Sequence, residues 1–347
     1  MRVLLIQTGF IGDVILSTPV FSRAKDIYPN AKVDLLTTKV AADLFEQDDR
    51  FDRVIVYDKR GEDGGISGFL RILFELRKQN YNSIITLHKS IRTSLLVYLT
   101  RAKNRLGFKE ASLNYLFNKS SARSDLSHEV LRNLAIYRAV GREPEPCPMQ
   151  LSYSATVNNS VEKLIAKYTR PIVGIAPGSV WATKRWTMEG FAEVAKDISN
   201  LGYQVLLIGG LEDKESADSI ISNTANCENL CGKLSLAESA CLISKLKVLI
   251  CNDSSPLHMA SAAQTPVIAL FCATVPEFGF GPWMVPSRVL GVEGLDCRPC
   301  GRHGGNTCPT GTHFCQLQLK STQVLAAFKD LLAELLDSKG VNENLHQ

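Results

Sequence analysis

The stretch VLLIQTGFIGDVILSTPV, residues 3–20, begins with an apolar run, turns at two glycines and continues into an apolar pattern of helical period. Residues 3–7 are predicted to form a buried strand and residues 14–28 a helix, joined by a turn that holds Gly9, Gly12 and Asp13. A buried strand followed directly by a helix is typical of a parallel α/β sheet. The turn interrupts the apolar run too early for a secretory signal peptide. We therefore expect this run to be the first strand of a cytoplasmic protein.

The strand–turn–helix pattern recurs in two halves of the chain. The predicted strands of the first half are residues 3–7, 32–36, 53–57, 83–87 and 104–108. Those of the second half are residues 172–176, 204–208, 248–251 and 267–271. This pattern predicts an α/β fold with two Rossmann-like, doubly wound domains that face a central cleft. We expect the first domain at 1–154, the second at 155–320, and a C-terminal helix and tail at 321–347.

The composition is that of a soluble globular enzyme. The chain has 347 residues, of which 45% are hydrophobic and 21% are charged, which is enough for two separate cores. The net charge of +4 does not indicate a nucleic-acid partner. The sequence has no apolar run of about 18 residues, the length that a membrane-spanning helix needs.

Ligands of parallel α/β sheets bind at the turns that follow the carboxyl ends of the strands, so these turns hold the candidate site residues. In the first turn, Gly9 and Gly12 allow the backbone to approach a ligand closely. The turn lacks the G-x-G-x-x-G spacing, so a nicotinamide cofactor is not predicted. Asp13 is a candidate general base; the alternative is that its carboxylate only complements the dipole of the following helix.

The second turn is PGSVWATKRW, residues 177–186. Lys184 and Arg185 beside a glycine turn suit a diphosphate, because lysine offers a point charge and arginine a fork of donors. The alternative is a solvated basic loop in which Trp181 and Trp186 are packing anchors. The candidate donor-binding residues of this turn are Gly178, Ser179, Thr183 and Lys184.

Two further turns follow predicted strands. In GGLED, residues 209–213, the backbone amides and an acid suit ribose, although the acid equally complements a helix dipole. In NDSSPLH, residues 252–258, Ser255 is predicted to cap a helix that begins at Pro256, and a helix N-terminus suits an anion. The candidate donor-binding residues of these turns are Gly209, Gly210, Glu212, Asp253, Ser254, Ser255 and His258.

A basic segment lies in the first half. Ten Lys and Arg fall between Arg77 and Arg123, and only Glu110 and Asp125 oppose them through residue 125. Such a segment suits a phosphorylated, carboxylate-rich glycolipid and the anionic leaflet that holds it. Just before it, the apolar residues between 66 and 74 suit either contact with lipid headgroups or the buried face of a helix. The candidate acceptor-binding residues are Gly9, Gly12, Lys89 and Arg92.

Four of the ten cysteines lie within residues 297–315, with the spacing C-x2-C-x7-C-x6-C. Cys297, Cys300, Cys308 and Cys315 are candidate ligands for zinc or an iron–sulfur cluster. Only one of the two pairs has the tight spacing that a structural zinc site usually has twice. The alternative is a structural loop or clip, which we expect to lie away from the four turns.

The four turns together resemble those of the ADP-heptose:lipopolysaccharide heptosyltransferases, glycosyltransferase family 9, and most of all the second-heptose enzymes, heptosyltransferase II. The matching stretches are GFIGDVILSTPV at 9–20, PGSVWATKRW at 177–186, LIGGLED at 207–213 and NDSSPLHMASAAQTPVIALF at 252–271. Their order and separation match over residues 1–335.

The resemblance implies a GT-B fold, with the acceptor on the N-terminal domain and the nucleotide sugar on the C-terminal one. It implies inverting transfer of a heptose from ADP-heptose to the lipid A–Kdo inner core of lipopolysaccharide, with no metal or cofactor. Asp13 matches the proposed base, and Lys184 the lysine that stabilises the departing diphosphate. Asp253, with Ser254, Ser255 and His258, matches the donor-binding motif. We expect a cytoplasmic protein in peripheral contact with the inner membrane.

Three alternatives remain beside this reading. The first is another sugar transferase of the same family with a different donor or acceptor. The second is a nucleotide-sugar epimerase of similar fold. The third is a metal- or redox-sensing module built on the cysteines.

Overall fold

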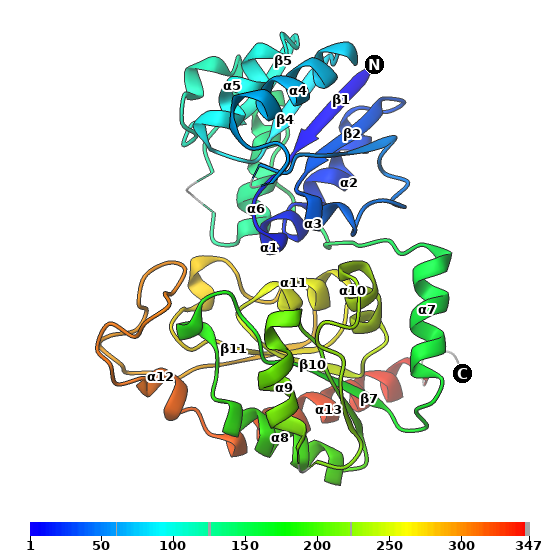
Figure 1. Ribbon diagram of the computed structural model, residues 1–347, viewed down its shortest axis with the longest axis vertical. Helices are drawn as coiled ribbons and strands as arrows, with labels where there is room; N and C mark the ends of the chain where they lie inside the picture. The colour runs from blue at the N-terminus through cyan, green and yellow to red at the C-terminus, as the bar shows by residue number, and fades with distance from the viewer. Residues whose placement is uncertain (60, 124–125, 223, 344–347) are drawn as a thin grey trace. The chain divides into compact units, whose positions relative to one another are not determined.

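Two parallel six-stranded sheets organise the part of the chain that the computed structural model describes, residues 1–59, 61–123, 126–222 and 224–343. One sheet lies in the unit Met1–Ser154 and the other in the unit that begins at Ala155. Each sheet has its own helices and its own buried core (Figure 1). No helix among the described residues combines the length and the apolar character needed to cross a membrane.

The N-terminal sheet has the strand order β3-β2-β1-β4-β5-β6. Its strands are β1 Arg2–Ile6, β2 Lys32–Thr37, β3 Arg53–Val56, β4 Ser83–Thr86, β5 Asn104–Phe108 and β6 Lys119–Ser121. Its helices are α1 Ile11–Ile15, α2 Thr18–Ile27, α3 Lys39–Ala42, α4 Gly65–Lys78, α5 Ile91–Leu99 and α6 Glu129–Leu134, with short 3-10 turns η1 Asn114–Leu116 and η2 Ala135–Val140. Because the strand order reverses between β1 and β4, the topological switch point lies between these two strands.

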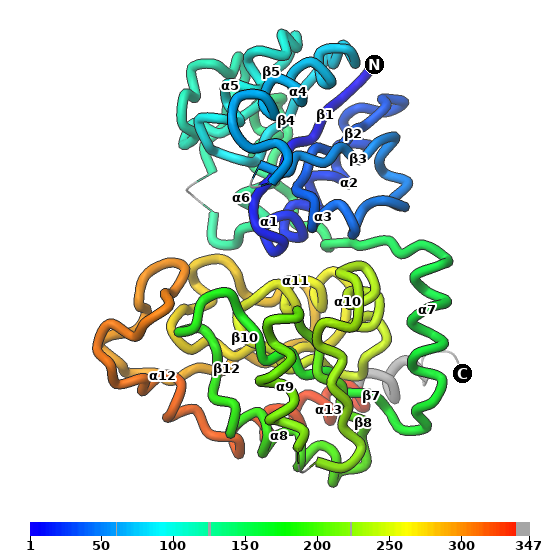
Figure 2. Tube along the Cα trace, viewed as in Figure 1, coloured from blue at the N-terminus to red at the C-terminus, as the bar shows by residue number. Residues whose placement is uncertain are grey.

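The C-terminal sheet has the order β12-β11-β10-β7-β8-β9, which repeats the same winding and places its switch point between β7 and β10. Its strands are β7 Ile172–Ala176, β8 Gln204–Leu207, β9 Cys227–Asn229, β10 Val248–Asn252, β11 Val267–Leu270 and β12 Ser287–Leu290. Its helices are α7 Ala155–Ile165, α8 Met188–Asn200, α9 Lys214–Ile221, α10 Leu236–Ser244, α11 Ser255–Ala262, α12 Phe314–Leu317 and α13 Ser321–Glu343, with 3-10 turns η3 Ala182–Lys184, η4 Leu211–Asp213 and η5 Pro276–Phe278. Figure 2 shows the long irregular segment, in orange, that runs between β12 and α13.

All nine predicted strands are present, with ends that shift by a residue at most. The single helix predicted at 14–28 is wrong, because the structure divides it into α1 and α2. Pro19 has no amide hydrogen to continue the helical ladder, and the Thr18 hydroxyl donates to the Ile15 carbonyl at 2.8 Å in its place. The break ends the short helix that carries Asp13.

Candidate functional site

Asp13 lies in α1, directly beyond the carboxyl end of β1. One oxygen of its carboxylate accepts a hydrogen bond from the Phe10 amide at 3.2 Å. The Gln7 side chain holds the same turn, since its oxygen accepts from the Gly9 amide at 3.1 Å and its nitrogen donates to the Ser17 hydroxyl at 3.0 Å. The carboxylate is therefore half-buried in a turn that local hydrogen bonds fix in place.

The glycine at position 9 is required by close packing. A Cβ atom there would lie 2.9 Å from Asp13 Oδ2 and 3.2 Å from Gln7 Oε1. Any side chain would push the carboxylate out of its present position. Gly12, the other predicted acceptor-binding glycine, lies inside α1, where its carbonyl accepts from the Leu16 amide at 2.9 Å.

Two lysines, Lys59 and Lys89, lie beyond the carboxyl ends of strands in the same sheet. The sequence predicted Lys89 as a site residue but not Lys59. Lys59 follows β3, and its ammonium donates to the Thr8 hydroxyl at 2.5 Å. The pKa of His88, just after β4, is lowered to about 4, first by burial and then by Lys59 and Lys89. The position of Lys59 directly after a predicted strand was the signal that could have identified it.

Arg92, a predicted acceptor-binding residue, is largely engaged in the fold. Its guanidinium donates to the Tyr57 hydroxyl and, at 2.8 Å each, to the carbonyls of Asp63 and Gly65. It also stacks over the rings of Tyr57 and Phe69. These contacts tie the loop between β3 and α4 to the start of α5. Lys89, in contrast, is exposed.

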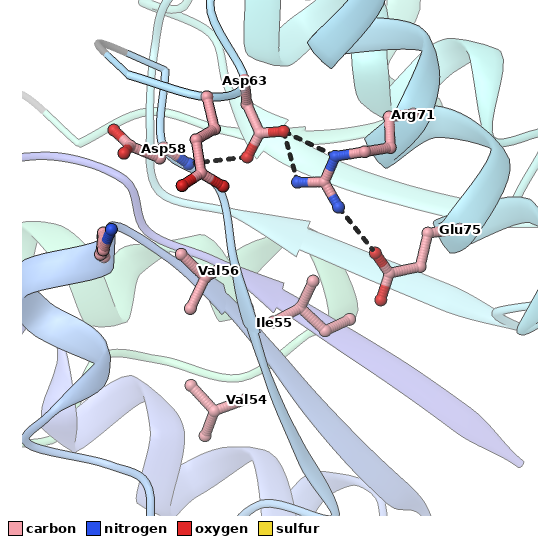
Figure 3. A pocket seen from close by; sticks show the side chains of 9 residues that line it. Val54, Ile55, Val56, Asp58, Asp63, Arg71 and Glu75 are labelled. Atoms are coloured by element: carbon pink, nitrogen blue, oxygen red, sulfur yellow. Dashed lines mark hydrogen bonds and ion pairs between the residues drawn. The ribbon is translucent and has the colours of Figure 1, made fainter.

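A cavity of about 260 Å³ lies on the other side of this loop, against the exposed edge strand β3 (Figure 3). Arg71 crosses it and pairs with Asp63 and, at 3.9 Å, with Glu75. The Asp63 carboxylate also accepts from the Asp58 amide at 3.0 Å. Asp63 and Glu75 thus pair with arginines, and none of the predicted site residues lines this cavity.

In the C-terminal unit, three of the predicted turns lie next to one another, at the carboxyl ends of neighbouring strands. The second turn follows β7, the third follows β8 and the fourth follows β10, and these strands are neighbours in the order β10-β7-β8. The second and fourth turns flank the switch point between β7 and β10, where open α/β sheets bind their ligands. The structure therefore gathers the predicted donor-binding turns into one place.

An ion pair links the second turn to the fourth. Lys184 Nζ lies 2.6 Å from Asp253 Oδ2, and the side chains are only 12% and 5% exposed. The Thr274 hydroxyl donates to the same carboxylate oxygen at 2.7 Å. An ammonium has three donors, so Asp253 fixes the position of Lys184 while leaving donors for a ligand.

Asn252 fixes the backbone beside this pair. Its side chain, fully buried, donates to the Pro177 carbonyl at 2.7 Å and accepts from the Trp186 amide at 3.0 Å. The Trp186 ring is buried in the core and its indole nitrogen donates to the Leu319 carbonyl at 3.0 Å. One amide side chain therefore clamps both ends of the turn that carries Lys184.

Asp213 contacts Gly178 and Gly209, and the predicted Glu212 contacts Gly210, where a Cβ would overlap its carboxylate. A Cβ at Gly178 would overlap the Asp213 carboxylate, and one at Gly209 would lie 2.6 Å from its Oδ2. The Gly210 amide donates to that oxygen at 3.0 Å. Burial raises the pKa of Asp213 above its ordinary value, which the Gly210 amide partly offsets. Glu212 is exposed.

The start of α11 differs by one residue from the prediction. Ser254 is the N-cap and Ser255 the first helical residue, so the predicted cap at Ser255 is wrong. The Ser254 hydroxyl donates to the Asn252 carbonyl at 3.4 Å and makes no capping bond to the helix. His258 is 4% exposed on the buried side of α11. Ser179 is half-buried, and its carbonyl accepts from Arg185 Nε at 2.7 Å.

The cysteine-rich segment packs directly on the second turn, so the expectation that it lies away from the turns is wrong. The Thr183 hydroxyl donates to the Gly305 carbonyl at 3.0 Å and accepts from the Gly305 amide at 2.8 Å. The Gln316 side chain donates to the carbonyls of Ala182 and Arg185 at 3.0 and 2.5 Å. Thr183 is therefore a support for the turn that holds Lys184.

The predicted metal site finds no support in the structure. Within the ranges described, no group of three or more His, Cys, Asp or Glu is arranged to hold a metal ion. Cys315 packs in the hydrophobic core, the Cys300 thiol donates to the Cys297 carbonyl at 3.0 Å, and Cys308 bonds Thr310. The four thiols lie near enough to interact, since after burial the other three raise the pKa of Cys315, but among the described residues they do not form a ligand set.

Comparison with known proteins places these features in a family. The model of glycosyltransferase family 9 (heptosyltransferase) matches residues 69–308. Lipopolysaccharide heptosyltransferase 2 of Salmonella typhimurium is 26% identical over 294 residues, which cover 80% of this chain and 84% of the relative.

Two solved structures share the fold over nearly their whole length. A family 9 glycosyltransferase from Veillonella parvula has a TM-score of 0.86 at 22% identity, over 96% of this chain and 97% of its own. ADP-heptose lps heptosyltransferase II of E. coli has a TM-score of 0.78 at 24% identity, over 96% and 99%. The predicted fold class, an α/β chain of GT-B type with two Rossmann-like units, is confirmed.

Proposed function

This chain belongs to glycosyltransferase family 9, and we propose that it moves a heptose from ADP-heptose to the inner core of lipopolysaccharide, as its curated relatives named for that reaction do. Family membership favours transfer to an acceptor over the epimerase and the sensing module considered above. Among the transferases, the second-heptose enzyme is preferred, since relatives of that name match this chain. The proposed acceptor is the lipid A–Kdo core with its first heptose.

The observation that carries the proposal is the buried Lys184–Asp253 pair at the switch point of the C-terminal sheet. When the bond from the sugar to the diphosphate breaks, the electron pair leaves with ADP and negative charge develops on its oxygens. An ammonium held in position stabilises that charge without reorganisation of the site. The turns with Gly178, Gly209 and Gly210 would bring backbone close to the nucleotide.

In the N-terminal unit, we assign Asp13 as the base. It takes the proton of the acceptor hydroxyl while the acceptor oxygen forms its bond to the anomeric carbon, on the face opposite the leaving ADP. Lys59 and Lys89 supply positive charge for the anionic acceptor sugars. The proposed transfer uses no metal or cofactor. The acceptor is a lipid, so we further propose that the protein works in the cytoplasm in peripheral contact with the inner membrane.

The test is transfer by the purified full chain from ADP-heptose to Kdo-lipid A, with and without the first heptose. Product only with the heptosylated acceptor supports the second-heptose reaction, and product only without it assigns the first. No product with either acceptor would overturn the proposal. The hypothesis to test next would then be a sugar transferase of the same family with a different donor or acceptor.

Variants of the two assigned residues test the mechanism. Asp13→Asn should abolish transfer and leave ADP binding, measured by calorimetry, nearly unchanged, because the nucleotide is assigned to the other unit. Asp26→Asn, an exposed change on α2, is its matched control. Lys184→Ala should weaken donor use or turnover, with Lys196→Ala on the outer side of α8 as control. Wild-type rates in Asp13→Asn would remove the base assignment.

A further inference from the structure

Helix α4 is apolar on two opposite sides. Its inner side places Ile72, Leu73 and Leu76 in the core of the N-terminal unit. Its outer side leaves Ile66, Leu70 and Phe74 exposed by 80%, 41% and 55%. These three residues are spaced four apart, so they form one stripe along a helix about 21 Å long.

Helix α5 repeats this arrangement beside α4. Ile91, Leu95 and Tyr98 are exposed by 56%, 38% and 47%, while Leu96 and Val97 are buried. The two helices run side by side on one sheet face in Figure 1. We call the six outward side chains of the two stripes the α4–α5 apolar face.

Two arginines hold the helices together at both ends. Arg92 of α5 donates to the carbonyls of Asp63 and Gly65 at the start of α4. Arg77 of α4 donates to the Leu99 carbonyl at the end of α5 at 2.7 Å. The two stripes are therefore fixed as one surface rather than carried by independent helices.

The surroundings of this face are strongly basic. From residue 66 to residue 109 the sequence has nine Lys and Arg (Arg71, Arg77, Lys78, Lys89, Arg92, Arg101, Lys103, Arg105 and Lys109) and a single acid, Glu75. That acid is already paired, with Arg53 at 3.0 Å and Arg71 at 3.9 Å. Positive charge around an apolar surface complements an anionic lipid leaflet.

A cavity at the end of the face repeats the same chemistry. It measures about 390 Å³ and opens where α4 and α5 end. Arg77, Arg101 and Lys103 line it, and its lining includes no acid. A phosphate group in this cavity would meet both positive charge and hydrogen-bond donors.

We propose that the α4–α5 apolar face docks on the surface of an anionic phospholipid bilayer, with the Arg77–Arg101–Lys103 cavity taking a lipid headgroup phosphate. This inference rests on the proposed function, because docking serves the reaction only if the acceptor is anchored in a membrane. Docking places the loop with Lys89, at the start of α5, beside the leaflet. The partner is the bilayer itself, so binding needs no sugar acceptor.

The experiment is co-sedimentation of the full chain with vesicles of phosphatidylcholine and phosphatidylglycerol in equal parts, and with phosphatidylcholine alone. We expect binding about tenfold tighter to the anionic vesicles, which weakens as salt rises. Leu70→Ser with Phe74→Ser should weaken it by about tenfold, and Arg101→Gln with Lys103→Gln should remove most of the preference for anionic lipid. Val40→Ser with Leu201→Ser, exposed apolar residues outside the face, should bind as the wild type does.

The outcomes separate the possible occupants of the face. Equal binding by the wild type and the Leu70/Phe74 variant would overturn the proposal, as would absence of wild-type binding. If that variant instead abolished self-association in sedimentation velocity and left vesicle binding unchanged, a second copy would be the occupant. The variant should keep wild-type transfer to a detergent-dispersed acceptor and lose it on vesicle-borne acceptor. Failure of all transfer would count against the proposed function but leave the vesicle result standing.

Discussion

Removal of the Lys184 ammonium should destabilise the C-terminal unit as well as stop the reaction. Lys184→Met would leave the Asp253 carboxylate, 5% exposed, without its cation, while the Thr274 hydroxyl still donates to it at 2.7 Å. Removing one partner of a buried ion pair costs about 3–5 kcal/mol, because the other charge stays desolvated and uncompensated. We expect a loss of about 3 kcal/mol in the free energy of unfolding, since Thr274 still donates.

A double-mutant cycle measures the pair itself. Asp253→Asn alone leaves the ammonium unpaired, while the double variant with Lys184→Met buries no charge. The double variant should be less destabilised than the sum of the single variants by about 2 kcal/mol. The assay is urea unfolding followed by tryptophan fluorescence, which reports Trp186 in the core of this unit. Additivity within about 0.5 kcal/mol would refute the reasoning, because it would mean that the charges do not interact.

Activity should not follow stability through this cycle. If Lys184 stabilises the leaving diphosphate, Lys184→Met and the double variant should both lose about 10²–10³ in turnover, the range seen when one transition-state donor is removed. A double variant that regains both stability and transfer would show that Lys184 only holds the turn in place.

Three further predictions follow from other contacts. Asn252→Leu should cost about 2–4 kcal/mol of stability, since it leaves the Trp186 amide and a proline carbonyl without their partner, and a urea midpoint equal to the wild type would contradict this. His88 is neutral in the folded state down to pH about 4, whereas an unfolded histidine titrates near 6.5; stability should therefore fall as the pH drops from 6.5 to 4, and His88→Gln should reduce that fall in acid unfolding curves. The pKa of Cys308 is lowered to about 6, first by the Thr310 hydroxyl, so iodoacetamide at pH 7 should modify Cys308 first, and Thr310→Val should slow that reaction in peptide mapping.

The sequence predicted the interior strands and the edge strand β3, and it missed the other edge strands, β6, β9 and β12. Strands such as β1 and β7 are buried on both faces, so they appear as continuous apolar runs. β6, with the sequence KSS, and β9, with CEN, are edge strands of their sheets, where a strand needs little apolar side-chain area. Backbone pairing with one neighbour forms these strands, and backbone pairing leaves no pattern in the side chains.

The sequence predicted the candidate site residues from their positions after strands, but it could not predict their contact partners. Asp13, Lys184 and Asp253 each follow a predicted strand, and in the structure each lies in a turn next to a switch point. The pairing of Lys184 with Asp253 and the support of Thr183 by Gly305 join segments far apart in the chain. Such contacts depend on which strands are neighbours and on where an irregular segment folds back, and neither is encoded in local periodicity.

The apolar stretch at residues 66–74 shows why two readings of one pattern need not exclude each other. The sequence left it as either the buried face of a helix or a lipid contact, and the structure divides its residues between an inner and an outer side. A helix that is apolar all round is normally buried all round. Here only the inner side is covered, so Ile66, Leu70 and Phe74 remain in water, where serine would make the unit more soluble. Exposed apolar side chains of this kind are explained if they contact an apolar partner. The cations beside them indicate that this partner also carries negative charge.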